Sequence, residues 1–287
     1  MREPFQVPRL VVEGAVTSPP HAAQIEDIDP RRLAIAMLLL GLREPGEPIY
    51  LVLAPEDSSA ARSAPGWIAG YAFSDQDVAV LFPARTPTYP DSNFEELVLH
   101  EVGHILVARA SGGVDLPRWF NEGLALFIGR PWRLEDHSRV TWALVSRRNV
   151  TLADLEDHFA TNRAAAAHAY ALAGAFVHDL LQRHGPDAAA LVLAKVAAGA
   201  SFEDAFAQAT GVSLEEAEAS FWGRHTFIYR WVPVLTSSAT LWIAISLLAL
   251  VAFKRRRKRD AALRERWEQE DQAVEDDPAW QDRQSPE

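Results

Sequence analysis

The stretch LVLHEVGHILVARA, residues 97–110, places two histidines four positions apart and a glutamate directly after the first histidine. On an α-helix, residues four apart project from the same face about one turn apart. His100 and His104 can therefore direct ring nitrogens at one metal ion, and Glu101 falls beside that ion rather than on it. Two imidazoles do not complete a zinc shell, so a later residue must supply a third ligand.

The residues around this motif have the signals of a capped helix. Ser92 and Glu95 have the spacing of a capping box. Gly112 and Gly113 follow the last turn, where glycine is common. The buried stripe is expected to consist of Phe94, Leu97, Val98, Ile105 and Leu106. A chance match to H-E-x-x-H is uncommon within such a helix, so the motif favours a metal site.

A candidate third ligand lies in PRWFNEGLALF, residues 117–127. Glu122 falls early in a second helix that Pro117 can open, and the preceding glycines allow the chain to turn back between the two helices. Taken alone, Glu122 is equally well explained as a solvated glutamate that the helix dipole favours. Its position after HEVGH favours the interpretation as a ligand.

HEVGH followed by RWFNEGLALF resembles the gluzincin group of zinc metallopeptidases. The resemblance is closest to the peptidase MA-like domains, whose pattern is HExxH followed by W-x-x-E-G-x-A. It extends over about residues 45–222 and includes PGWIAGYAF and DVAVLFP before the motif, which are similar to the family's edge-strand region. The resemblance implies one Zn²⁺ per chain on His100, His104 and Glu122. It also implies Glu101 as the general base and a peptide or protein substrate.

Two related groups of metallopeptidase fit less well. A metzincin needs glycine at 107 and histidine at 110, where this chain has Val107 and Ala110. An intramembrane protease buries its HExxH motif in a spanning helix, whereas Glu95 and Glu96 precede this motif by only one turn. We therefore expect the metal site in a domain outside the lipid.

The resemblance also concerns the group that stabilises the oxyanion, which in gluzincins is commonly a tyrosine or histidine on a later helix. Tyr170 stands where the family often has a tyrosine, and His168 and His178 are alternatives. Aromatic residues at helical spacing are more often part of a core, so a purely structural role for Tyr170 stays open. Asn121 is expected to orient a ligand, to bond substrate or to stabilise the helix start.

The remaining patterns predict an α+β fold. Residues 49–55 and 77–83 are short strand candidates, the second of which could pair with an extended peptide, and residues 8–16 are a weaker candidate. Helices are predicted at residues 30–42, 164–185, 187–199, 201–211 and 213–225. The expected domain covers residues 1–228, with a small mixed sheet in about 1–90, then the HExxH helix and a helical subdomain in about 91–228.

A membrane helix is predicted near the C-terminus. Residues 231–253 carry no charge and are numerous enough to cross a bilayer, although a buried core helix is an alternative. The basic run KRRRKR follows at 254–259, which by the positive-inside rule places the tail over 254–287 in the cytoplasm and residues 1–230 outside it. Since MREPFQVPRLVVEG shows no apolar signal segment, export would need a segment upstream of this chain.

Composition restricts the function further. A net charge of -11 gives no global basic face, so nucleic-acid binding is not expected. The chain has no cysteine, so any metal site must use histidine and carboxylate. The sequence therefore predicts a single-pass, membrane-anchored zinc metallopeptidase with an extracytoplasmic catalytic domain. The alternatives are an inactive, membrane-tethered binding or assembly module and a cytoplasmic regulator anchored by its tail, with which the basic flank conflicts.

Overall fold

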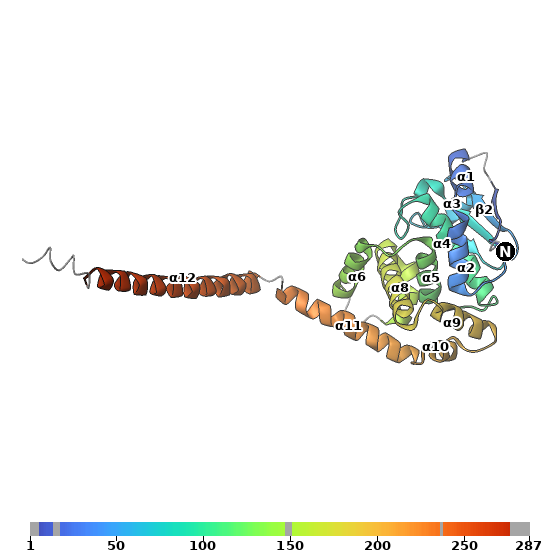
Figure 1. The fold of residues 1–287 in the computed structure, drawn as a ribbon. Coiled ribbons are helices and arrows are strands. Elements are labelled where there is room, and N and C mark those ends of the chain that lie inside the picture. Colours follow the sequence, from blue (N-terminus) through green and yellow to red (C-terminus); the bar gives the residue numbers. More distant parts are fainter. Residues whose placement is uncertain (1–5, 14–17, 147–150, 236–237, 276–287) are drawn as a thin grey trace, which may run out of the picture. The chain divides into compact units, whose positions relative to one another are not determined.

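The computed structural model describes residues 6–13, 18–146, 151–235 and 238–275, which fall into two compact units, Met1–Thr226 and Phe227–Glu287. Figure 1 shows the fold and labels strand β2 and most of the helices. The first unit has the following elements. In chain order they are β1 (Leu10–Glu13), α1 (Pro19–Glu26), α2 (Pro30–Leu40), β2 (Ile49–Leu53), α3 (Ser59–Ser63), β3 (Gly70–Phe73), β4 (Val78–Leu81), a 3-10 turn (Pro83–Arg85), α4 (Phe94–Ala110), α5 (Arg118–Gly129), α6 (Leu134–Ser146), α7 (Leu152–Thr161), α8 (Arg163–His184), α9 (Ala188–Ala197) and α10 (Phe202–Thr210). Helix α11 (Leu214–Leu235) begins in this unit and continues past its boundary.

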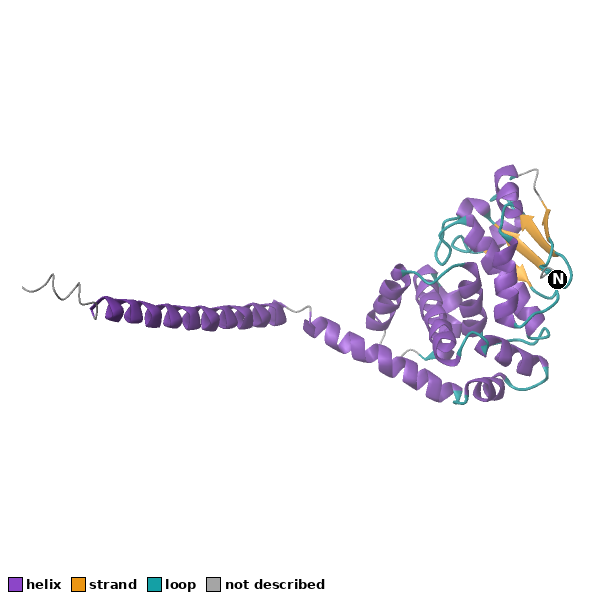
Figure 2. Cartoon of the chain, in the orientation of Figure 1, coloured by secondary structure: helices purple, strands orange, loops and turns teal. Residues whose placement is uncertain are grey.

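The four strands form one small mixed sheet at an edge of the unit, drawn in orange in Figure 2. Their order is β1-β2-β4-β3, with parallel pairs except for the antiparallel pair β3 and β4. The predicted α+β class with a small mixed sheet is therefore confirmed. Strand β4 lies between two neighbours, so the expectation that strand 77–83 offers a free edge for a peptide is wrong. On that side of the sheet the edge strand is β3, whose short sequence GYAF has no strong strand pattern.

Helix α4 lies at the centre of the unit. It packs against α1, α2, α5 and α9 and against strands β3 and β4. Most of its side chains are buried, in keeping with apolar residues on all sides of the helix. Its N-cap is Asn93, one residue later than the sequence predicts: the Asn93 side chain accepts a hydrogen bond from the Glu96 amide. The Glu96 carboxylate in turn accepts one from the Ser92 amide.

A tight turn between α4 and α5 brings the two motifs together. Gly112 and Gly113 adopt φ values of 66° and 77°, a region that glycine enters without steric cost. The two helices then pack so closely that a Cβ on Gly103 would lie 3.2 Å from the Ala125 backbone. This packing faces the start of α5 toward the middle of α4, as the ligand interpretation of Glu122 requires.

The later helices match the sequence patterns well. The four helices predicted after residue 160 correspond to α8, α9, α10 and the start of α11 and are confirmed. The capping box at Ser213 and Glu216 is present, with each amide donating to the other residue's side chain. Helices α1, α3, α6 and α7 are additions that the sequence patterns did not predict.

The prediction of a membrane span at 231–253 is wrong. Within the described part of the chain, no helix is both long and apolar enough to cross a bilayer. The uncharged stretch is shared between α11, which ends at Leu235, and α12 (Ser238–Glu275), while residues 236–237 lie outside the described residues. In α12 the charged run begins at Lys254, so its apolar part is short of the roughly 20 residues that a span needs. The predicted single-pass topology, with an extracytoplasmic domain and a cytoplasmic tail, depends on this span and is therefore also wrong.

Candidate metal centre and active site

Three predicted ligands meet in the first unit. The Nε2 atoms of His100 and His104, one turn apart on α4, are 3.2 Å from each other. Each lies 3.5 Å from Oε2 of Glu122, in the first half of α5. The three side chains are largely buried, with exposed fractions of 4%, 15% and 9% respectively. The structure thus places the donor atoms of two helices around one point.

The chemistry of this donor set fits a divalent metal ion. Ligand bonds of roughly 2.0–2.2 Å in a tetrahedral site separate neighbouring donor atoms by about 3.3–3.5 Å, close to the distances observed here. Oε2 of Glu122 is buried and has no hydrogen-bond partner among the described residues. A buried carboxylate oxygen without a partner is costly unless a cation compensates its charge.

The electrostatics of the site show how strongly it favours positive charge. Burial opposes the charged form of His100, but the Asp91 and Glu122 carboxylates outweigh it and raise the pKa of this imidazole to about 9 in the metal-free protein. The pKa of His104 is also raised, because Glu122 outweighs the effect of burial. Burial disfavours the Glu122 anion, yet the two histidines hold its pKa below the usual value. The acidic side chains around the two histidines therefore favour positive charge at this point, which a metal cation can supply.

Glu101 lies beside this cluster under the edge strand. Burial raises the pKa of its carboxyl group to about 7, although both neighbouring histidines act in the opposite direction. Its Oε2 atom is buried without a hydrogen-bond partner among the described residues. Strand β3 approaches so closely that a Cβ on Gly70 would lie 2.9 Å from the other carboxylate oxygen, Oε1. Glycine at this position therefore leaves room for the Glu101 carboxylate.

Asn121 contacts His104, one of the predicted ligands. Its side-chain oxygen lies 2.9 Å from Nδ1 of His104, which donates the hydrogen bond. The Nε2 atom of the same ring is then left to face the donor cluster. Of the three roles expected for Asn121, this contact corresponds to the orientation of a ligand.

The cluster opens into a cavity of about 280 Å³. The cavity is bounded by β3 and the loop before it, by residues 88–91, by α4 and α5, and by parts of α7 and α8. Tyr170 on α8 lines it, with its ring centroid 6.2 Å from that of His100. Burial holds the pKa of the Tyr170 phenol well above its usual value. The alternatives His168 and His178 are not among the described residues that line the cavity, and His178 instead stacks on Trp132.

Several further residues of the site were not identified from the sequence. Tyr89 and Asp91 line the cavity from the loop before α4. Arg118 donates from Nε to Oε1 of Glu122 over 3.3 Å, and its guanidinium lies over the ring of Phe159. Arg118 could have been noticed, since it precedes the third ligand by one helical turn. Tyr89 and Asp91 stand in a loop without a periodic pattern, which gives no signal of this kind.

Comparison with known proteins agrees with the geometry of the site. The family model of the peptidase MA superfamily matches residues 47–229, which include every residue of the cluster. No curated protein and no solved structure matches the chain. The match covers more than half of the sequence, and the chain belongs to the peptidase MA superfamily.

Proposed function

We propose that the chain is a zinc-dependent metallopeptidase of the gluzincin type, in which His100, His104 and Glu122 hold one Zn²⁺. The observation that carries this proposal is the triangle of three donor atoms at 3.2–3.5 Å, with Glu101 buried beside it in the same cavity. Two imidazoles and one carboxylate are a known ligand set of catalytic zinc. A bound zinc ion supplies Lewis acidity, which lowers the pKa of water to about 7 and polarises a carbonyl group.

Glu101 is the general base of the proposed reaction. Its carboxylate accepts a proton from the attacking water and passes that proton to the amide nitrogen as the C–N bond breaks. Burial raises the pKa of this carboxyl group, which favours its acceptance of the proton, and the charge of a bound zinc ion would act in the opposite direction. Because Glu101 follows His100 directly, the helix that carries the ligands also holds the base beside them.

Tyr170 is the proposed donor to the oxyanion. The phenol is protonated at neutral pH, and burial raises its pKa further above the ordinary value. Its hydroxyl group can therefore donate a hydrogen bond to the carbonyl oxygen as negative charge develops there. The position of Tyr170 on the α8 wall of the cavity, near the His100 ring, supports this assignment.

Strand β3 is the proposed guide for the peptide substrate. One edge of β3 pairs with β4, and residues 67–72 line the cavity. An extended peptide can add to a free strand edge through main-chain hydrogen bonds. Since Gly70 lies next to Glu101, a peptide paired with β3 passes close to the base.

The test is metal analysis and peptide cleavage with the purified full-length chain. We expect one zinc per chain and cleavage of a broad peptide library that a chelator abolishes. Glu101→Gln should keep the zinc and lose turnover, whereas His100→Ala should lose both. His178→Ala is the matched control because His178 stands outside the cavity wall and should keep both.

Two results contradict the proposal in different ways. A wild-type chain without stoichiometric zinc excludes the metal site. A chain that holds zinc but cleaves no member of the library is a binding module with a metallopeptidase fold.

A further inference from the structure

The two candidate histidine ligands differ in the hydrogen-bond partner of Nδ1, the ring nitrogen that faces away from the cluster. His104 donates from Nδ1 to the amide oxygen of Asn121. Nδ1 of His100 is buried and has no hydrogen-bond partner among the described residues. The nearest acid is Asp91, whose Oδ1 atom lies 3.8 Å from this nitrogen and is likewise buried without a partner. Two buried polar atoms of complementary chemistry thus face each other.

Asp91 does not itself belong to the donor cluster. His100 presents Nε2 to His104 and Glu122, while Asp91 lies beside Nδ1, the other nitrogen of the ring. If Nε2 carries the lone pair that binds a metal, Nδ1 must carry the proton. Asp91 then faces an N–H group, for which a carboxylate is the strongest acceptor among protein side chains.

The burial of Asp91 strengthens this argument. Its side chain is 5% exposed, as deep as that of His100 at 4%. A carboxylate removed from water in this way is unfavourable unless it is paired and hydrogen-bonded. Among the described residues, the Nδ1 atom of His100 is the one ion-pair partner within 4 Å of the Asp91 side chain.

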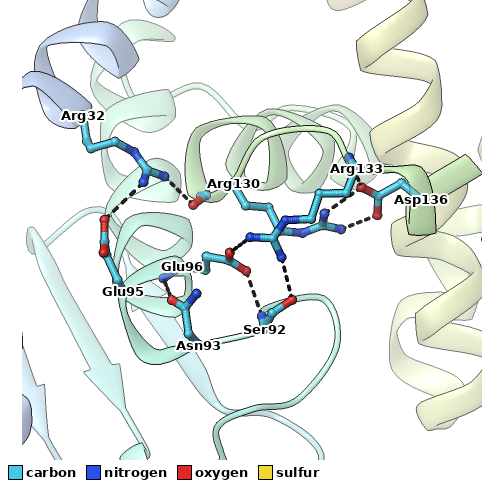
Figure 3. Close-up of polar contacts among 9 residues, drawn as sticks. Arg32, Ser92, Asn93, Glu95, Glu96, Arg130, Arg133 and Asp136 are labelled. Carbon is cyan, nitrogen blue, oxygen red and sulfur yellow. Dashed lines mark hydrogen bonds and ion pairs between the residues drawn. The ribbon is translucent and has the colours of Figure 1, made fainter.

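The chain around Asp91 is held in place from both sides. The Asp91 amide donates to the Thr88 carbonyl over 2.9 Å, which closes a tight turn before it. The next residue, Ser92, donates its amide to Glu96 on α4 and accepts at Oγ from Arg133. Arg133 also pairs with Glu96. Figure 3 shows these contacts of Ser92 with Glu96 and with Arg133.

The segment that carries Arg133 is itself fixed. Asp136 receives both terminal nitrogens of Arg130, at 2.7 and 2.6 Å, and also the Arg133 amide. These contacts, visible in Figure 3, tie the loop after α5 to the start of α6. The residue that follows Asp91 is therefore anchored to two separate parts of the fold, which limits the positions that the Asp91 side chain can reach.

We infer that Asp91 is a positioning residue for the metal site, which accepts the Nδ1–H of His100 and so completes a carboxylate–histidine–metal arrangement. The inference rests on the proposed function only in that a metal binds; catalysis plays no part in it. Loss of a supporting contact of this type typically lowers metal affinity by about 10- to 100-fold.

The first measurement is zinc affinity of the metal-free full-length chain in competition with a chromophoric chelator. Asp91→Asn keeps an acceptor oxygen but loses the charge, and Asp91→Ala removes both. We expect affinity to decrease in the order wild type, Asp91→Asn, Asp91→Ala, with a loss of about 10- to 100-fold for the alanine variant. Asp179→Asn is the matched control, since Asp179 pairs with Arg224 and does not line the cavity. Its zinc affinity should equal that of the wild type.

The second measurement separates positioning from a general structural role. With ¹⁵N-labelled histidine and bound zinc, the ring N–H signals of His100 and His104 can be followed by NMR. Asp91→Asn should shift the His100 signal upfield and speed its exchange with water, while the His104 signal, supported by Asn121, stays in place. If both signals move together, or neither moves, the positioning role is wrong.

The affinity data have their own contradicting results. If both Asp91 variants bind zinc within about twofold of the wild type, the inference is overturned while the proposed function stands. If the wild-type chain binds no zinc, both fail. If Asp91→Ala does not fold, the near-isosteric Asp91→Asn decides the question alone.

Discussion

Gly70→Ala tests whether the edge strand and the proposed base are packed as closely as the structure indicates. A Cβ at this position would lie 2.9 Å from Oε1 of Glu101 and 3.0–3.1 Å from two carbons of the same side chain, whereas ordinary contacts are 3.4–4 Å. The carboxylate must therefore move by roughly half an ångström or more. Misplacement of a catalytic group by about 1 Å can reduce the rate about 10²-fold. We expect kcat/KM to fall by about 10- to 100-fold.

The same substitution should have little effect on stability. The φ angle of Gly70 is not positive, so alanine fits the backbone, and the contacted atoms belong to the end of a flexible side chain. We expect the free energy of unfolding to change by no more than about 1 kcal/mol, with zinc content unchanged. Gly66→Ala is the matched control, because a Cβ on Gly66 meets no atom within 4 Å.

The assays are peptide cleavage, metal analysis and chemical denaturation of the three proteins side by side. Activity of Gly70→Ala within threefold of the wild type would refute the close approach of β3 to the base. Loss of zinc from this variant would also refute the reasoning, because it would show that the added methyl group disturbs the ligands rather than Glu101.

Three other predictions concern the ligands and the base. Zinc binding at pH 7.5 should release at least about one proton, because the pKa of His100 is raised to about 9 and the metal needs a neutral ring. Calorimetry in buffers of different ionisation enthalpy measures this number, and no release at that pH would contradict the charged state of the metal-free site. In the metal-free protein, Glu101→Gln should become more stable than the wild type as pH rises from 5 to 8. The folded pKa of about 7 lies above the ordinary 4.5, so the wild type loses up to roughly 3 kcal/mol over this range and the glutamine variant does not; denaturation curves that keep a constant difference count against it. Asn121→Ala should weaken zinc binding by about 10-fold because it removes the hydrogen bond to His104. Chelator competition measures this affinity, and an unchanged value would show that the contact is dispensable.

The parts of the site that could be predicted from sequence depend on local geometry. His100 and His104 project together because the helix repeat alone places residues four apart on one face. Glu122 required one further feature, a turn that glycine permits, and Gly112 and Gly113 supply it. Each of these three positions is fixed by at most one helix, one turn and the start of the next helix.

Asp91 could not be predicted in the same way. It stands nine positions before His100, and its distance from the ring depends on the turn at Thr88 and on the anchoring of Ser92 by Arg133 from another part of the chain. No periodic pattern marks such contacts. Strand β3 was expected only through the resemblance of PGWIAGYAF to an edge-strand region, because four residues that include a glycine gain their extended structure from pairing with β4 rather than from intrinsic preference.

The error at residues 231–253 has a different physical origin. Hydropathy counts consecutive uncharged residues, but a bilayer span also requires one helix that contains about 20 of them. Here α11 ends at Leu235 and α12 begins at Ser238, and α12 reaches its charged run at Lys254. Within the described residues, no single helix therefore holds an uncharged stretch of that length.

The proposed metal site joins two helices that also pack closely against each other. Helix α4 contributes His100 and His104, α5 contributes Glu122, and between them Gly103 packs directly on Ala125. A metal held by both helices would add a strong link between them. Because the metal binds the folded arrangement and not the separated helices, its binding free energy adds to the free energy of unfolding. The close α4–α5 packing and the metal therefore act in the same direction, since the packing sets the distance between the donors and the metal opposes their separation.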